Sequence, residues 1–159
     1  MPTNKQRLFG AILSTGITVG GAWLASASYS DSTSAANTTF SEGISATFSG
    51  IRNATGSIVV IVFADRASFK NYDVDNAVGY TEIQAVTGTV KVAFPDLKTG
   101  PYAIVAFHDE DDNQDLNMNG EWPTEGYATS GAVDAYDTPT FRSATLRKSS
   151  VNITMHYAN

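Results

Sequence analysis

The stretch SIVVIVFA, residues 57–64, places six apolar side chains in an unbroken row before Ala64. A strand with one buried face alternates apolar and polar residues. A short continuous run of β-branched and aromatic residues bounded by turn signals is instead typical of a strand covered on both faces. The turn sequence NATG, residues 53–56, precedes this run. The sequence therefore predicts a central strand that is covered on both faces, or nearly so.

Other short runs of β type surround this strand, separated by turn signals, and none has a convincing helical period. About seven strands in about 115 residues predict an all-β protein, an antiparallel β-sandwich of immunoglobulin-like or prealbumin-like type, with a closed barrel as the alternative. The final run alternates apolar and polar residues, as a half-buried antiparallel strand does. The segment FKNYDVDN is either one helical turn or loop. The expected strands beside residues 57–64 cover residues 44–51, 80–86, 88–94, 102–107, 143–146 and 151–157, and FKNYDVDN covers residues 69–76.

The first 27 residues have the pattern of an export signal. Lys5 and Arg7 form a basic start, residues 8–24 are apolar, and ASA at residues 25–27 supplies a small-residue cleavage site. The alternative is a retained membrane anchor, but the apolar run is at the short end of the spanning range and contains Gly, Ser and Thr. No cysteine follows for a lipid anchor. We therefore expect bacterial export of the protein, to the periplasm or out of the cell.

Residues 28–43 are rich in Ser, Thr and Asn and are expected to form a flexible leader, so that the folded domain covers residues 44–159. Removal of residues 1–27 would leave 8 basic and 16 acidic residues. Nucleic acid and anionic lipid surfaces are poor partners for such a charge, whereas cations are good ones. The absence of cysteine excludes disulfides, thiolate zinc sites and a thiol nucleophile.

A long acidic loop is expected directly after the strand at residues 102–107. Residues 109–125 contain seven of the sixteen acidic residues of the chain and no Lys or Arg. Calcium binds six to eight oxygen atoms at about 2.3–2.6 Å, and short Asp and Asn side chains at alternate positions can point into one loop. The many oxygens favour calcium over magnesium, and the lack of cysteine disfavours zinc. The residues at alternate positions are Asp109, Asp111, Asn113, Asp115 and Asn117.

This spacing resembles an EF-hand loop but differs from it at two positions. Gln114 stands where an EF-hand has glycine, and Gly120 stands where it has the bidentate glutamate. Glu121 or Glu125 could supply that carboxylate from downstream. No flanking helices are expected, so the sequence predicts a calcium loop between strands, with a solvated acidic loop as the alternative.

Residues near the loop allow a second interpretation, a hydrolase or a carbohydrate-binding protein. His108 could act as a general base or metal ligand, or it could simply be hydrogen-bonded within the loop. Trp122 and Tyr127 could form a platform for sugar or peptide, or cap the sandwich core. Such a site would need converging groups such as Asp134, Tyr136 and Asp137. No nucleophile elbow, phosphate loop or paired-histidine motif is present, so a non-enzymatic module is expected.

Several motifs together resemble the DUF2141 family, exported bacterial proteins of unknown function. In that family a "G-x-Y-A" run leads into "H-D-x-N-x-N-x-x-L-D-x-N", followed by "P-x-E-G-(Y/F)-G-F-S" and "P-x-F-x-x-A". The opening GIRNATG is similar to the family's own opening, and the resemblance extends over about residues 44–157. The matching segments here are GIRNATG at residues 50–56, GPYA at 100–103, HDEDDNQDLNMN at 108–119, PTEGY at 123–127 and PTFRSA at 139–144.

The resemblance implies an exported β-sandwich and supplies no activity. The chain departs from the family pattern inside the loop, where Asp112 and Gln114 replace expected glycines and Asn117 replaces the usual aspartate. Residues 128–130 read Ala-Thr-Ser where Gly-Phe-Ser is typical. A side chain at a position that needs positive φ costs energy, least for Asn and Asp, so Gln114 is the departure expected to alter the loop most.

Overall fold

The computed structural model describes residues 38–158 of the 159-residue chain. The predicted signal peptide, residues 1–27, and most of the predicted leader, residues 28–37, lie outside the described residues. Among the helices within residues 38–158, none has the length and apolar character needed to cross a membrane.

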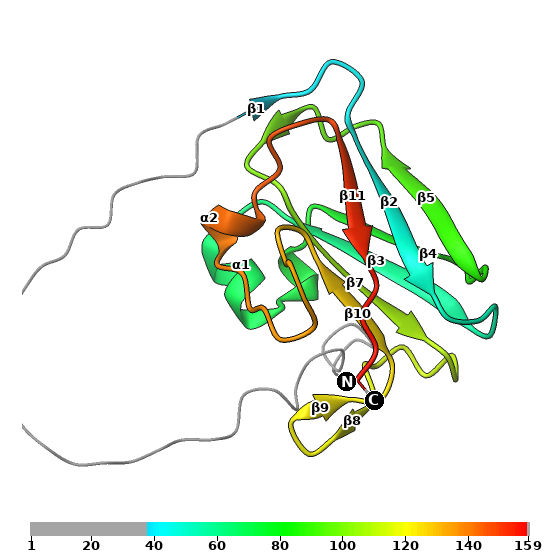
Figure 1. Cartoon of the computed structure of the whole chain (residues 1–159). Coiled ribbons are helices and arrows are strands. Elements are labelled where there is room, and N and C mark those ends of the chain that lie inside the picture. The colour runs from blue at the N-terminus through cyan, green and yellow to red at the C-terminus, as the bar shows by residue number, and fades with distance from the viewer. Residues whose placement is uncertain (1–37, 159) are drawn as a thin grey trace, which may run out of the picture.

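Seven strands form two facing sheets (Figure 1). The first sheet is antiparallel throughout and has the order β10 (Gly126–Thr129), β7 (Ala103–Asp109), β3 (Ser57–Phe63) and β4 (Gly79–Gln84). The second has the order β11 (Ser150–Thr154), β2 (Ile44–Ile51) and β5 (Gly88–Phe94). The predicted all-β sandwich is confirmed, and these two sheets do not close into a barrel.

Short elements complete the described part of the chain. Strand β1 (Thr38–Thr39) pairs with β6 (Thr99–Gly100), and β8 (Met118–Asn119) pairs with β9 (Trp122–Pro123). Helices α1 (Arg66–Asn71) and α2 (Phe141–Ala144) lie together on one side of the molecule in Figure 1. A 3-10 turn, η2 (Val74–Asn76), follows α1, so the segment at residues 69–76 is largely helical.

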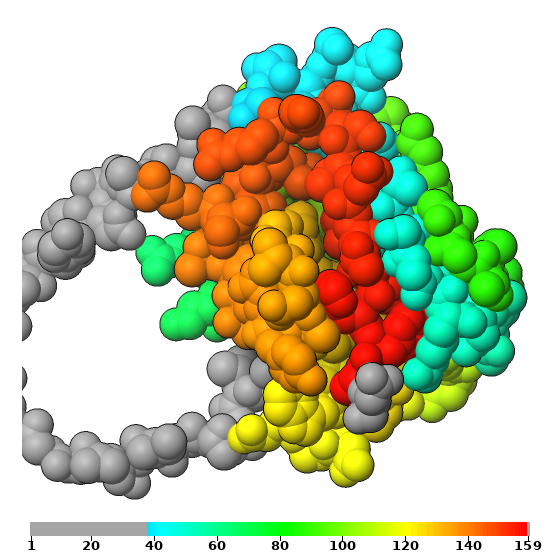
Figure 2. Space-filling model, viewed as in Figure 1, coloured from blue at the N-terminus to red at the C-terminus, as the bar shows by residue number. Residues whose placement is uncertain are grey.

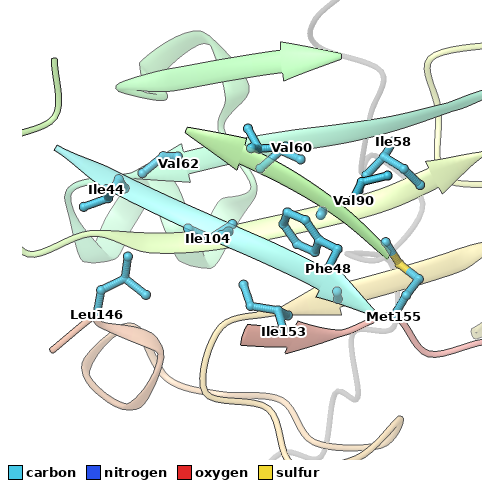
Figure 3. Packing of buried hydrophobic residues seen from close by; sticks show 14 of the residues in the cluster. Ile44, Phe48, Ile58, Val60, Val62, Val90, Ile104, Leu146, Ile153 and Met155 are labelled. Carbon is cyan, nitrogen blue, oxygen red and sulfur yellow. The ribbon is translucent and has the colours of Figure 1, made fainter. Parts of the chain in front are cut away.

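Strand β3 is buried on both faces, as its unbroken apolar run predicts. Successive side chains of a strand point to opposite sides of the sheet. Ile58, Val60 and Val62 belong to the core between the two sheets, together with Ile44 and Phe48 of β2 (Figure 3). The alternate residues pack on the opposite side against the helices, and all six side chains are completely inaccessible to solvent.

The helical layer closes the outer face of the four-stranded sheet. The ring of Phe69 on α1 lies 5.7 Å from that of Phe141 on α2 and 6.1 Å from that of Phe63 on β3, measured between centroids. Leu116, from the acidic loop, is buried in the same cluster. The domain therefore has three layers, with the four-stranded sheet in the middle.

The strand predicted at residues 143–146 is wrong. The chain forms α2 there, and Thr140 begins the helix by accepting a hydrogen bond from the Ser143 backbone N–H at 3.3 Å. Phe141 and Ala144 are both buried, three positions apart, as expected for one helix face. A run of four residues is too short to distinguish the period of a helix from that of a strand. The seventh strand of the two sheets is β10 instead.

The final strand is present, but its predicted antiparallel direction is wrong. Strand β11 runs parallel to β2, with Ser150 opposite Ser45 and Thr154 opposite Ser49. Alternation along a strand shows which face is buried and carries no information about the direction of its neighbour. The direction is set by the path of the chain through α2, which returns it to the other sheet.

Because both faces of β3 are buried, shortening a side chain on either face should destabilise the domain to a similar extent. Ile58→Ala, in the core between the sheets, and Ile61→Ala, under the helices, should each lower the free energy of unfolding by about 2–5 kcal/mol. Lys91→Ala on the exposed side of β5 is the control and should change it by less than about 0.5 kcal/mol. Urea unfolding measures all three. A near-neutral Ile61→Ala would contradict the helical layer.

Candidate metal centre

Asp109 connects the buried sheet to the acidic loop. It is the last residue of β7, lies opposite Ser57 of β3, and is fully buried. Its Oδ1 accepts a hydrogen bond from the Asn113 backbone N–H at 3.0 Å, and its Oδ2 accepts one from that of Gln114 at 2.8 Å. The loop is therefore wound around this carboxylate.

Glu125 holds the other end of the loop. It precedes β10 and only 4% of its surface is exposed. One carboxylate oxygen accepts a hydrogen bond from the Glu110 backbone N–H at 2.8 Å, and the other accepts one from that of Asn117 at 2.9 Å. A single side chain thus ties the start of the loop to its end.

Asp109, Asp111 and Glu125 form a trio that could hold a metal ion, because one carboxylate oxygen from each lies within 4.8 Å of the other two. Burial raises the pKa of Asp109 and that of Glu125 above their usual values, and the charge of Asp111 adds to both increases. Two buried carboxyls beside a third create an unfavourable concentration of negative charge. A bound cation would relieve it.

Two asparagines surround the exposed member of the trio. The amide nitrogens of Asn113 and Asn117 donate to Oδ2 of Asp111 at 3.1 and 2.9 Å, and Asn113 also donates to Oδ1 of Asn117 at 2.9 Å. Both asparagines are among the predicted ligands, and their amides lie beside the carboxylate of Asp111. Rotation of either amide by half a turn would exchange its nitrogen for its oxygen.

The remaining two predicted ligands are placed differently. Asp115 lies on the same loop, where its backbone N–H donates to Oδ1 of Asn113 at 2.7 Å, but its carboxylate is not in the trio. Glu121 is exposed and lies beside Trp122 at a separate pocket.

Glu110 is paired with a basic residue that lies far away in the sequence. Arg52, in the turn between β2 and β3, donates to Glu110 Oε1 from Nε at 2.8 Å and to Oε2 from Nη2. The amide of Asn53 also donates to Glu110. The hydrogen bonds from Arg52 hold the pKa of Glu110 below its usual value. The segment at residues 109–125 has no base of its own, and the fold supplies one.

His108 is a structural residue within the described part of the chain. It is fully buried, with Nε2 at 2.7 Å from the Thr55 carbonyl oxygen and Nδ1 at 2.8 Å from the Tyr157 hydroxyl. A carbonyl can only accept, so Nε2 carries a proton and donates it to the Thr55 carbonyl oxygen. Both ring nitrogens are engaged, which leaves neither of them ready to act as a base or to bind a metal.

Two glycines of the matching motifs allow other groups to approach closely. At Gly56, which has a φ of +66°, a Cβ atom would lie 1.9 Å from the Asp109 carbonyl oxygen. At Gly126 it would lie 2.4 Å from the ring of Tyr157. The segments RNATG and EG therefore hold the acidic loop against the sheet, through Arg52 and Asn53 on one side and Glu125 on the other.

The aromatic residues of the second interpretation differ in burial but line the same pocket. Tyr127 is partly buried and packs against the core beneath the helices, as a cap does, and its ring also borders this pocket. Trp122 is half exposed and lines the pocket together with Tyr136 and Asp137. Asp134 does not line this pocket; its Oδ1 accepts a hydrogen bond from the Tyr136 backbone N–H at 2.8 Å.

Comparison with known proteins gives one match. The family model DUF2141, described as an uncharacterized protein conserved in bacteria, matches residues 46–155. No curated protein and no solved structure matches the chain.

The loop contains two residues with left-handed backbone, Asp112 with φ of 55° and Gln114 with φ of 65°. These are the positions at which the resemblance leads one to expect glycine. Gln114→Gly should remove strain of about 1 kcal/mol, partly offset by the flexibility of glycine in the unfolded chain, and give a net gain of up to about 0.5 kcal/mol.

Gln114→Ala is the matched control, because alanine shortens the side chain and keeps the strain. It should give no gain when the two variants are compared by urea unfolding. Equal effects of alanine and glycine would contradict the strained conformation at this position.

Proposed function

The chain belongs to the DUF2141 family of uncharacterized bacterial proteins, and we propose that its acidic loop is a structural calcium site in an exported, non-enzymatic β-sandwich module. The gathering of Asp109, Asp111 and Glu125 within 4.8 Å carries this proposal. Calcium would offset the mutual repulsion of three carboxylates, two of them buried.

The chemistry of the donors favours calcium among the common metals. The trio offers only oxygen, and the side-chain amides of Asn113 and Asn117 lie beside it. Calcium accepts such a set with added backbone carbonyls or water, whereas magnesium needs a stricter octahedron. Zinc prefers nitrogen or sulfur ligands, but the chain has no cysteine and both ring nitrogens of His108 are engaged.

The site is placed to stabilise the fold. Its loop connects β7 to β10, two neighbouring strands of the central sheet. Leu116 in the same loop is buried in the core beneath the helices. An ion that joins Asp109 at the start of the loop to Glu125 at its end would hold this connection closed and Leu116 in position.

The proposed setting is the periplasm or the cell exterior, supported by the export-signal pattern of residues 1–27. Extracellular calcium-binding modules often have low affinity for the ion. A weak site would suit this setting, because millimolar calcium is available there. A net charge of −6 for the chain favours cationic partners over nucleic acid.

Calcium titration tests this proposal. We expect saturable one-site binding by calorimetry, and at one hundred times the dissociation constant a stabilisation of about 2.7 kcal/mol. For a domain of this size such a stabilisation corresponds to a rise in Tm of roughly 8–15 °C. Absence of binding at millimolar calcium would leave an acidic loop without an ion and end the proposal.

A pair of Asp→Asn variants locates the ion. Asp111→Asn keeps an oxygen that can accept from the neighbouring asparagine amides but loses the charge, so calcium affinity should fall about tenfold or more. Asp96→Asn makes the same charge change at an exposed turn on another part of the surface and should leave the affinity unchanged. Calorimetry on both variants measures this difference. Equal affinities in the two variants would place the ion elsewhere.

The stabilisation by calcium should depend on pH. In the ion-free protein the raised pKa of Asp109 and of Glu125 favours folding at low pH, and that contribution is lost as pH rises through the folded pKa values. Calcium needs the charged carboxylates, so protons compete with it. The rise in Tm on adding calcium should be largest near neutral pH and should shrink as pH falls.

Melting with and without calcium from about pH 7.5 to pH 4.5 measures this trend. At each pH, the contribution of groups that do not contact the ion is the same with and without calcium, so it cancels in the difference between the two melting temperatures. A calcium-induced shift that stayed constant over this range would contradict the involvement of these two carboxyls.

A further inference from the structure

A pocket of about 310 Å³ lies between α1, the β8–β9 hairpin and the segment that follows β10. Small-molecule sites start at about this volume. In Figure 2 the segment after β10, coloured orange, adjoins the yellow hairpin. The pocket is notably aromatic, and the rings that line it come from Phe69, Tyr72, Trp122, Tyr127 and Tyr136.

Two of these rings are open to solvent and stand at a right angle. Trp122 is 52% exposed and Tyr136 is 75% exposed. Their centroids lie 5.4 Å apart and their planes meet at 87°. Large exposed aromatic surface gathered at one place marks an interaction site more often than isolated exposed residues do.

The segment that carries Tyr136 is braced, so the pocket is formed before a ligand arrives. The Tyr127 hydroxyl donates to the Ala135 carbonyl oxygen. Oδ1 of Asp134 accepts from the Tyr136 N–H at 2.8 Å, and Oδ2 of Asp137 accepts from the Val133 N–H at 3.1 Å. A preformed site loses less conformational entropy on binding.

The charges around the pocket have one sign. Glu121 and Asp137 are its charged lining residues, and no Lys, Arg or His lines it. The adjoining loop adds the charges of residues 109–115, and the whole chain has a net charge of −6. Such a field attracts cations and repels anions, while a neutral sugar gains nothing from it.

We propose that this pocket binds a small organic cation of the quaternary ammonium class that has no anionic group of its own. The negative faces of aromatic rings attract such cations, and this attraction strengthens where water is excluded. The carboxylates of Glu121 and Asp137 add charge complementarity. The proposal rests on the pocket and does not require calcium in the loop.

Choline and its neutral isostere 3,3-dimethylbutan-1-ol provide the test, because they match in shape and differ in charge. In a Trp23→Phe background Trp122 is the only tryptophan, so its fluorescence reports on the pocket. We expect a saturable change with choline, with an affinity at least about tenfold higher than that of the isostere. Phosphocholine should bind more weakly than choline, since its phosphate meets the acidic surroundings.

Three variants assign the binding to the pocket. Tyr136→Ala should lower choline affinity severalfold, and Glu121→Gln should lower the affinity for choline but not for the isostere. Val133→Ala is the control, since Val133 is 83% exposed on the same segment but does not line the pocket. The Val133→Ala variant should bind choline with the same affinity as the parent protein.

Several outcomes would overturn the proposal. They are no response to choline, equal affinities for choline and its isostere, stronger binding of phosphocholine, or a response to neutral oligosaccharides without one to choline. Titrations with calcium and with chelator separate this proposal from that of the calcium site. Choline binding that survives the chelator supports the pocket even if the loop binds no calcium.

Discussion

Burial of both faces of the central sheet is the constraint on which the rest of the structure depends. Strand β3 and its neighbour β7 have no exposed residue, so each face needs a covering layer. The three-stranded sheet covers one face, and α1, α2 and Leu116 cover the other. The helices and the acidic loop are therefore parts of the core architecture, even though they lie outside the two sheets.

The same constraint explains the chemistry of the loop. Strand β7 is buried up to its last residue, Asp109, so the carboxylate of Asp109 is shielded from water at the point where the loop begins. Hydrogen bonds from backbone N–H groups partly offset the cost of burying the carboxylates of Asp109 and Glu125, and Arg52 pairs with the charge of Glu110. Asp111 brings a third carboxylate within 4.8 Å of those of Asp109 and Glu125, and this concentration of negative charge is the physical reason to propose a cation there.

The loop and the aromatic pocket share a wall. Leu116 and Met118 line the pocket and belong to the segment between the two anchors of the loop, Asp109 and Glu125. Changes in the loop can thus reach the pocket through packed side chains without a separate conformational switch. Both proposed ligands are cations, in agreement with the acidic charge of the chain and with a pocket lining that has no basic residue.

The sequence by itself determined those features that repeat within a few residues. The unbroken run at residues 57–64 requires burial on both faces, and the alternate Asp and Asn side chains indicate a loop that concentrates oxygen. Patterns this local report periodicity and backbone conformation. Only the tertiary structure decided which distant residues meet: Arg52 with Glu110, Trp122 with Tyr136, and β11 parallel to β2. These contacts depend on the path of the chain, as does the choice of helix at residues 141–144, where packing on the sheet outweighed a short ambiguous pattern.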